Sequence, residues 1–414
     1  MPQGDSAEST NVVLELPGTG IRFDTWKSYS FHESYLEPSS SFSVTLGDET
    51  ISNKLQAAVA PGKVIQLTIN GKIQATCIVD RVCGRRSRGG GTDISIEGRD
   101  FLSPAIDGNP DPFTTQFPAS STLFDVIAGT FGPFGISAYS VDNDVNKNVI
   151  TGQVRGQPSS KKGRPLKSFT IHQLKAEPNE SAYQFASRIT QRFGLWIRPS
   201  SDGASIVICK PEFEQTSRYR LVHKRGAPGT SNNIINVDWS RDGQEQPSAI
   251  VATGFSTGGE QNRSKIKAIA VNELAVEAGS GFTNPRLATL VKTHKDAKQV
   301  PFRNTFGAGI GYPALPIRTM FMHDQESKTI DELTHFVQRE LSLRQRKAFT
   351  YHATVEGHMN NAQPWCVDTI CDVDDDYAQV HGPLWVLSRR FYKDRSSNGT
   401  RTDLEMILPG TLVF

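Results

Sequence analysis

An Asn-Gly turn between two alternating runs is the feature that most constrains the fold of this chain. In residues 63–80, KVIQLTINGKIQATCIVD, apolar and polar residues alternate on both sides of Asn70 and Gly71. The two central residues of a tight hairpin turn need positive φ, which asparagine and glycine tolerate best. The stretch therefore predicts an antiparallel hairpin. A second Asn-Gly dipeptide precedes the alternating run 402–408, so strands are expected near both ends of the chain.

Length and composition favour several domains rich in β-sheet. A chain of 414 residues suggests about three or four domains. The 35 glycines and 23 prolines favour turns over long helices. We predict a mainly β, multi-domain protein with α+β parts.

Charge, cysteine content and hydropathy narrow the class further. The net charge of +2 gives no general attraction to nucleic acid or to an anionic membrane. Five scattered cysteines favour free thiols in a reducing compartment over a disulfide framework. The N-terminus is polar, and no apolar run reaches the ~20 residues of a membrane helix. We therefore expect synthesis in the cytoplasm and no membrane anchoring.

The order of periodic segments predicts four domains. Alternating runs such as SFSVTL predict a β-barrel or sandwich at residues 11–103, and two amphipathic helices with a hairpin predict an α+β domain at 104–215. Strand-like runs and a helix that begins after Thr329 predict a further β-rich part at 216–256 and 326–414. Residues 257–325 are rich in glycine and proline and are expected to form the inserted domain.

Residues 366–382, CVDTICDVDDDYAQVHG, look most like a chemical site. The segment contains three possible metal ligands, Cys366, Cys371 and His381. Between them lies an acidic run of Asp372, Asp374, Asp375 and Asp376. An EF-hand calcium loop that starts at Asp372 would need glycine at Tyr377 and glutamate at Pro383. Cys366 and Cys371 are five residues apart, which places them on opposite faces of a strand. The segment is therefore expected to be an acidic loop between two strands.

No other pattern in the sequence carries chemistry. No pair of the many carboxylates in the sequence is distinguished by context. The glycines of 307–311 lack the flanking strand and helix of a nucleotide loop, and the basic segment 157–168 lacks interleaved aromatics. We predict no catalytic residue, no cofactor-binding residue and no metal ligand, so the protein is expected not to be an enzyme but to act through its surfaces.

Several segments, taken in order, resemble the baseplate hub proteins of contractile-tailed bacteriophages, especially those of Mu-like phages. In the N-terminal part these are TWKSYSF, SFSVTLGD, APGKVIQLTINGKIQATCIVDRV and ISIEGRDFLSPAID, the last with a strand ending in Gly98, Arg99 and Asp100. The C-terminal half contributes NNIINVDWSRDGQEQPSAIVATG, QPWCVDTICDVDDDYAQVHGPLWVLSRRFYKD and NGTRTDLEMILP. The resemblance covers about residues 11–256 and 326–414.

The resemblance implies a structural role. Hub chains of this family form homotrimers in which each chain carries two tube-like β-barrels, so that three chains present both three-fold and pseudo-six-fold symmetry. The resemblance implies that the two barrel domains of this chain are residues 11–103 and residues 216–256 with 326–414. The implied partners are the central spike, the tail tube or its initiator, and the tape-measure protein, with DNA only in passage through the lumen. The implied location is the tail baseplate of the virion, after synthesis in the bacterial host cytoplasm.

Three alternatives follow from the same sequence. The same fold could serve as the hub of a type VI secretion system or of another phage-like contractile injection system. A tail-associated peptidoglycan hydrolase is a further alternative, and a carbohydrate-binding module ranks below it. For the hub, the acidic residues Asp374, Asp375 and Asp376 are expected at a barrel rim that meets a neighbouring subunit or the lumen.

Overall fold

The computed structural model is mainly β with several sheets, as the sequence predicts. It describes residues 11–47, 58–87, 91–113, 115–118, 121–141, 174–191, 194–200, 202–203, 205–226, 232–256, 264–272, 289, 292–299, 318–325, 327, 329–393 and 399–412. In these ranges no helix is long and apolar enough to cross a membrane. Most of the predicted inserted domain and the segments 157–168 and 307–311 lie outside the described residues.

The first β unit lies near the N-terminus. Its strands are β1 (Val12–Leu16), β2 (Ile21–Phe23), β3 (Ser28–Ser34), β4 (Ser41–Leu46), β5 (Val64–Ile69), β6 (Lys72–Ser87) and β7 (Gly91–Asp100). The predicted hairpin is β5 and β6, and its turn residues Asn70 and Gly71 have φ of 48° and 77°. Alternate residues of β3, β4 and β7 are buried, which is the pattern of a sheet with one face on the core.

The second β unit is built from two strands before helix α7 (Ile330–Ala348) and four strands after it. They are β11 (Tyr219–His223), β12 (Ile234–Arg241), β17 (Phe349–Glu356), β20 (Ile370–Asp375), β21 (Val380–Lys393) and β22 (Arg401–Ile407). A small hairpin of β18 (Met359–Asn360) and β19 (Gln363–Pro364) lies beside them. The apolar residues of both β units pack into one continuous core.

The two β units have the same strand order. The first runs β3-β4-β7-β6-β5-β1, and the second runs β12-β17-β22-β21, continuing through β20 to β11. Each long strand also has a bulge at the same place, between Val79 and Arg81 in β6 and between Val386 and Ser388 in β21. One pairing differs, because β1 is antiparallel to β5 whereas β11 is parallel to β20. The shared order and bulge indicate an internal duplication.

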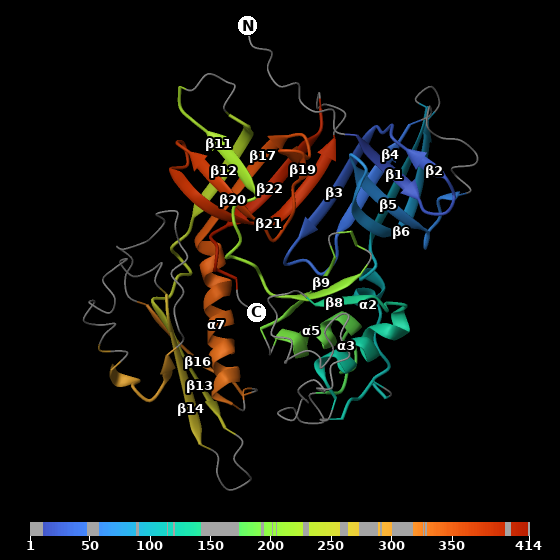
Figure 1. The fold of residues 1–414 in the computed structure, drawn as a ribbon. Coiled ribbons are helices and arrows are strands. Elements are labelled where there is room, and N and C mark those ends of the chain that lie inside the picture. Colours follow the sequence, from blue (N-terminus) through green and yellow to red (C-terminus); the bar gives the residue numbers. More distant parts are fainter. Residues whose placement is uncertain are drawn as a thin grey trace.

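A single junction joins the two units into one 13-stranded sheet. Strand β3 of the first unit pairs antiparallel with residues Ser388–Lys393 of β21, with Phe31 opposite Phe391. Figure 1 shows the two units side by side, forming the upper half of the molecule.

An α+β unit lies below the first β unit in Figure 1. It contains α2 (Ser103–Asp107), α3 (Leu123–Phe131), the 3-10 helix η1 (Gly132–Phe134), α5 (Ala182–Thr190) and a sheet of β8 (Tyr139–Val141), β10 (Ile206–Cys209) and β9 (Trp196–Pro199). Helix α5 is capped by Ser181, whose hydroxyl accepts a hydrogen bond from the Gln184 N–H. Asn179 lies in the turn before it, with φ of 67°.

A small sheet with one long helix completes the described fold. The sheet has the order β15 (Lys298–Gln299), β14 (Lys265–Val271), β13 (Ala249–Phe255) and β16 (Thr319–His323), and α7 (Ile330–Ala348) packs against it (Figure 1). Helix α7 begins after Thr329, as predicted. Strand β13, which the sequence analysis placed with the second barrel, pairs here instead. The division into four domains stays a prediction.

Candidate functional site

The junction between the two β units is held by a buried arginine. Arg389 of β21 is 1% exposed, and its guanidinium lies 2.6 Å from the Glu33 carboxylate of β3. The same guanidinium donates to the Gln74 side chain at 3.0 Å and to the Trp365 carbonyl. It also lies 4.7 Å from the centre of the Phe391 ring. Because a buried charge is tolerated only when it is fully paired, this cluster fixes β3 to β21.

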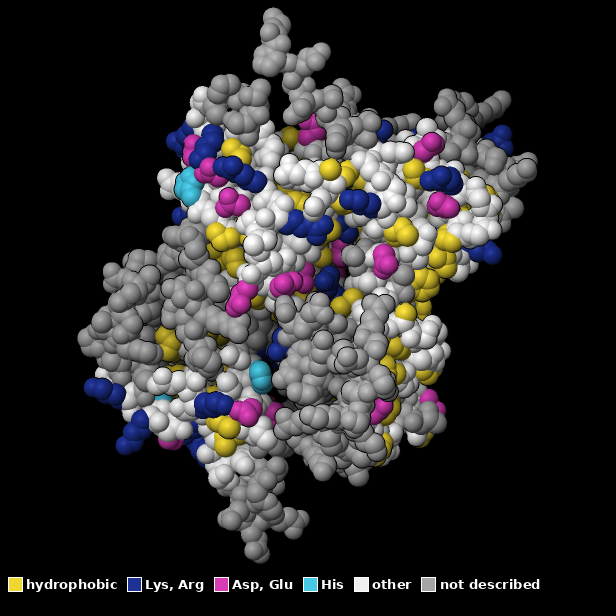
Figure 2. Space-filling model, in the orientation of Figure 1, with side chains coloured by type: hydrophobic (Ala, Val, Ile, Leu, Met, Phe, Trp, Pro, Cys, Tyr) yellow, Lys and Arg dark blue, Asp and Glu magenta, His cyan; other side chains and the backbone are white. Residues whose placement is uncertain are grey.

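The outer face of the sheet carries a polar hollow of about 410 Å³ above β3, β12, β17, β21 and β22. Its lining includes His32, Asn236, Asp238, His352, Thr354, Ser388, Arg390, Tyr392, Asp403 and Glu405. On the face shown in Figure 2, basic and acidic side chains are interspersed over the β-sheet half of the molecule. A wetted face with both charge signs opposite a packed core is typical of an antiparallel sheet with one solvated side.

The acidic segment is better ordered than the sequence suggested. It was expected to be a loop after a strand at about 365–372, but Ile370–Asp375 form β20 and only the residues after Asp375 turn toward β21. Cys366 precedes this strand, so the opposite-face argument does not apply to it, while Cys371 is buried in the core. The strand extends because β20 has partners on both sides, β11 and β21.

The three aspartates of the turn have different surroundings. Asp375 is fully buried and accepts hydrogen bonds from the Tyr351 hydroxyl and the Tyr377 N–H, both at 2.7 Å. Asp374 and Asp376 are partly exposed and share Lys224. Hydrogen bonding from Lys224 lowers the pKa of Asp374, and the Arg225 N–H does the same for the pKa of Asp376.

Asp374, Asp376 and His381 are also the grouping in the described chain that could hold a metal ion, with ligand atoms within 4.8 Å of one another. Lys224 already bridges both carboxylates, and His381 hydrogen-bonds Asp374 at 2.8 Å. The single positive charge of this ammonium offsets part of the charge of the two carboxylates without a metal ion. The expectation that the chain has no metal, cofactor or catalytic residues stays a prediction.

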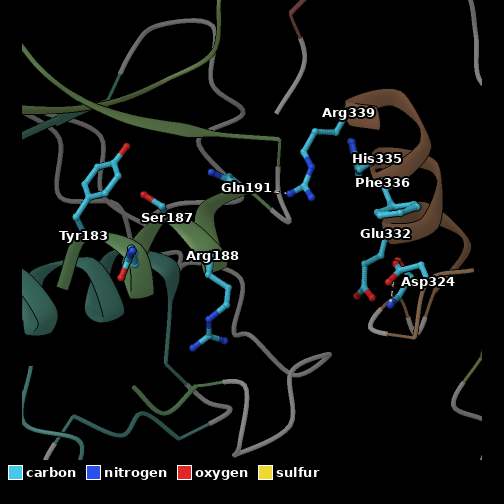
Figure 3. A pocket seen from close by; sticks show the side chains of 11 residues that line it. Tyr183, Ser187, Arg188, Gln191, Asp324, Glu332, His335, Phe336 and Arg339 are labelled. Atoms are coloured by element: carbon cyan, nitrogen blue, oxygen red, sulfur yellow. Dashed lines mark hydrogen bonds between the residues drawn. The ribbon is translucent and has the colours of Figure 1, made fainter. Parts of the chain in front are cut away.

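A second cavity, of about 570 Å³, lies between α5 and α7. Figure 3 shows Tyr183, Ser187 and Arg188 on one side and His335, Phe336 and Glu332 on the other. The Arg339 side chain reaches across and donates to the Gln191 side chain at 3.2 Å. Burial lowers the pKa of His335, which keeps that imidazole neutral near pH 7. The sequence did not predict this cavity, because its walls come from segments far apart in the chain.

Two strand edges of the described sheet have no partner strand for their backbone N–H and C=O groups. Strand β12 pairs with β17 on one side only, and residues Arg81–Arg86 of β6 pair with β7 only. Trp239 and Ile235 of β12 are 44% and 50% exposed. Open edges are a template for pairing with another chain, so these segments are candidate interfaces. In the sequence the only signal of β12 was NVDWS, in which alternation predicts a strand but not an edge.

Comparison with known proteins places the fold. Residues 11–100 match the model of the N-terminal part of the Mu phage baseplate assembly protein GpP-like family. No curated protein matches the sequence. The tail protein from Neisseria meningitidis MC58 has a TM-score of 0.68 at 18% identity, covering 97% of this chain and 98% of its own. The 43 kDa tail protein of prophage MuSo2 from Shewanella oneidensis has the same score and identity, covering 98% and 100%.

A more distant match is to a chain of a VgrG complex. A chain of the lidless PdpA–VgrG complex from Francisella has a TM-score of 0.51 at 9% identity, covering 98% of this chain and 66% of its own. At these identities the likeness shows the fold. The resemblance found in the sequence is thus confirmed: the N-terminal segment matches a Mu-type baseplate family, and the whole chain has the fold of solved tail proteins.

Proposed function

We propose that this chain is the baseplate hub of a contractile phage tail, a homotrimer that joins the six-fold tail tube to the three-fold central spike. The match of residues 11–100 to a baseplate assembly family and the fold shared with tail proteins support a structural role in a virion. We accordingly propose a non-enzymatic role, with the spike, the tube or its initiator, and the tape-measure protein as partners.

The internal duplication is the observation that carries the proposal. Two β units of one strand order lie side by side in each chain, and both have a bulge at the same position. Three copies would carry six similar units. A ring of that kind presents six-fold character to a tube and three-fold character to a spike, which is what an adaptor between the two symmetries requires.

The polar hollow supports a channel role. Its charged side chains include both signs, such as Asp238 beside β17 and Arg390 on β21. A lumen lined in this way is wetted and has no large field of one sign, so DNA or an extended protein could pass without being held. Asp374 and Asp376 are poorly suited to repel DNA from such a lumen, because Lys224 offsets part of their charge.

A second candidate is the hub of a type VI secretion system or another contractile injection system. The TM-score of 0.51 to a chain of the Francisella PdpA–VgrG complex favours it as the alternative, since the fold would be the same. The genes around the coding sequence discriminate between the two. Capsid and terminase genes favour the virion, and secretion-sheath genes without them favour the injection system.

The proposal is tested by measuring the mass of the assembled protein. Light scattering of the purified chain, alone and mixed with its spike and tube proteins, is expected to give a trimer. A chain that stays monomeric in both samples would contradict the hub assignment. Hydrolysis of purified peptidoglycan by the same sample, lost on replacement of one carboxylate, would contradict the non-enzymatic role.

A further inference from the structure

The bulges and pairings align the two β units residue by residue. One row across the first unit, Phe31, Phe42, Gly98 and Val79, has the same pairings as the row Trp239, Tyr351, Met406 and Val386 in the second. Trp239 of β12 therefore corresponds to Phe31 of β3. Counting past the bulge in the same way, Gly84 of β6 corresponds to Phe391 of β21.

In the described part of the chain, β3 pairs with β21, but the two strand segments equivalent to them, in β12 and β6, do not pair with each other. The edge strand of the first unit, β3, pairs with the part of β21 that extends past the bulge. The equivalent edge strand of the second unit is β12, whose outer side has no strand partner among the described residues. The equivalent part of β6, Arg81–Arg86, likewise pairs only with β7 in the described chain. The described part of each copy thus carries one unpaired edge of each kind.

The aromatic side chain on the unpaired edge is more exposed than its counterparts at the paired junction, as expected if a partner strand is missing. Phe31 and Phe391 at the closed junction are 1% and 0% exposed. The equivalent Trp239 is 44% exposed, with the Arg241 guanidinium 5.3 Å from its ring centre. At Gly84 a Cβ atom would meet nothing within 4 Å. The exposed Trp239 and the uncovered Gly84 thus occupy the positions at which the paired junction has the packed rings of Phe31 and Phe391.

We propose that β12 of one copy pairs antiparallel with Arg81–Arg86 of β6 in a second copy, in the register of the β3–β21 junction. The proposal rests on the proposed trimer, which supplies the second copy. The register is Trp239 opposite Gly84, as Phe31 is opposite Phe391. The indole then covers the glycine, an arrangement that stabilises glycines in sheets.

Charge supports this register independently of the aromatic residues. It places Asp238 opposite Arg85 and Asp242 opposite Arg81, so that both directly opposed charged pairs have opposite signs. Among the described residues Asp238 and Arg85 form no ion pair, and Arg81 has only a 4.0 Å contact with Glu97. A slip of one residue would oppose Asp238 to Gly84 in one direction and to Arg86 in the other. In both directions it would separate Asp242 from Arg81 and move every side chain to the other face.

The contact is head-to-tail, because it joins different strands of the two copies. Such a heterologous contact forms a closed ring when its rotation divides a full turn, and an open filament when it does not. Within each chain the same strand junction already relates the two units. In a ring of three copies, β3–β21 junctions within a chain would alternate with β12–β6 junctions between chains, and the strands would form one continuous ring.

Native Cys83 provides a test with a single substitution. The register places Ser240 opposite Cys83, so Ser240→Cys is expected to form a disulfide between copies when oxidised with copper phenanthroline. Directly opposed Cβ atoms lie about 4.5–5.5 Å apart and diagonal neighbours about 7–8 Å, whereas a disulfide requires about 3.5–4.5 Å. The expected result is covalent dimers and trimers on non-reducing gels.

Two matched variants control the register. Asp238→Cys presents a thiol diagonal to Cys83 and is expected to cross-link at least several-fold less. Ser240→Cys combined with Cys83→Ser is expected not to cross-link. A trimer by light scattering in which Ser240→Cys gives no cross-link, or Asp238→Cys links equally well, would overturn the strand contact and leave the hub proposal standing. A chain that is monomeric with its spike and tube proteins would contradict both.

Charge exchange gives a second measurement that needs no oxidation. Asp238→Arg and Arg85→Asp are each expected to raise the concentration at which half of the chain is trimeric. The two changes together restore the pair in reverse and are expected to recover most of the loss. A double variant that assembles no better than either single variant would exclude this pairing.

Discussion

At the scale of single residues, the aspartates of 374–376 show how burial separates side chains that look alike in the sequence. Asp375 is enclosed and accepts hydrogen bonds from the Tyr351 hydroxyl and from the N–H groups of Tyr377 and Ala378. Asp374 and Asp376 are at the surface beside Lys224. Asp375 therefore organises the turn, while its neighbours set only the local charge.

Replacing Asp375 by alanine is expected to destabilise the protein by about 2–4 kcal/mol, because it leaves a buried hydroxyl and two N–H groups without an acceptor. Asp374→Asn is the matched control and is expected to change stability little, because its ion pair is exposed to solvent. Urea denaturation of both variants measures the difference. Equal stability of the two would contradict the assigned role of Asp375.

His358 predicts an acid-sensitive fold. Burial lowers its pKa to about 3, and it is hydrogen-bonded to the Tyr29 hydroxyl at 2.7 Å and the Thr402 hydroxyl at 3.0 Å. The unfolded chain binds the proton near pH 6.5, so the folded state loses stability as the pH falls from there toward 3. The loss is expected to approach about 1.4 kcal/mol per pH unit.

The variant His358→Gln isolates this contribution. It is expected to be less stable at pH 7 but to show a shallower fall in the free energy of unfolding between pH 6.5 and 4.5. Denaturant titrations at several pH values measure both slopes. Parallel curves for the two proteins would mean that His358 does not cause the acid sensitivity.

At the scale of elements, the sequence predicted correctly the turns and helix ends that a few adjacent residues determine. The hairpin at Asn70 and the helix after Thr329 are confirmed, because the turn and the cap are each specified by a few adjacent residues. The pairing of β3 with β21 joins residues about 360 apart, and no adjacent residue encodes it. For the same reason β13 was assigned to the wrong sheet: an apolar run predicts burial but does not name its partner.

The candidate surfaces were harder to predict than the strands. Trp239 is one apolar residue in an alternating run and looks like a core position in the sequence. Its exposure follows from the position of β12 at the end of the sheet, which only the strand order reveals. The acidic segment, by contrast, drew attention through composition, although most of its charge is paired.

The junction between β units is expected to depend on both members of its ion pair. Arg389→Met alone leaves the Glu33 carboxylate buried beside apolar atoms and is expected to cost about 3–5 kcal/mol. Combining it with Glu33→Leu is expected to recover much of that loss, since a buried pair can often be replaced by apolar residues. Thermal unfolding of the three variants tests this, and equal losses in the single and double variants would contradict it.

At the scale of the whole molecule, the internal duplication of the β units is the main support for the proposed hub function. The sequence predicted two barrels from a resemblance and from two Asn-Gly turns. The structure adds that both units have one strand order and one bulge position and that they form a single sheet. A chain that already joins two such units edge to edge has the geometry to add further units through the same contact.

The most direct test of this account is a cryo-EM reconstruction of the purified chain assembled with its spike protein. The account predicts a three-fold ring in which six β units surround a channel, with Trp239 of each copy against Gly84 of the next. A monomeric or dimeric particle, or a ring without six similar β units around the channel, would contradict it.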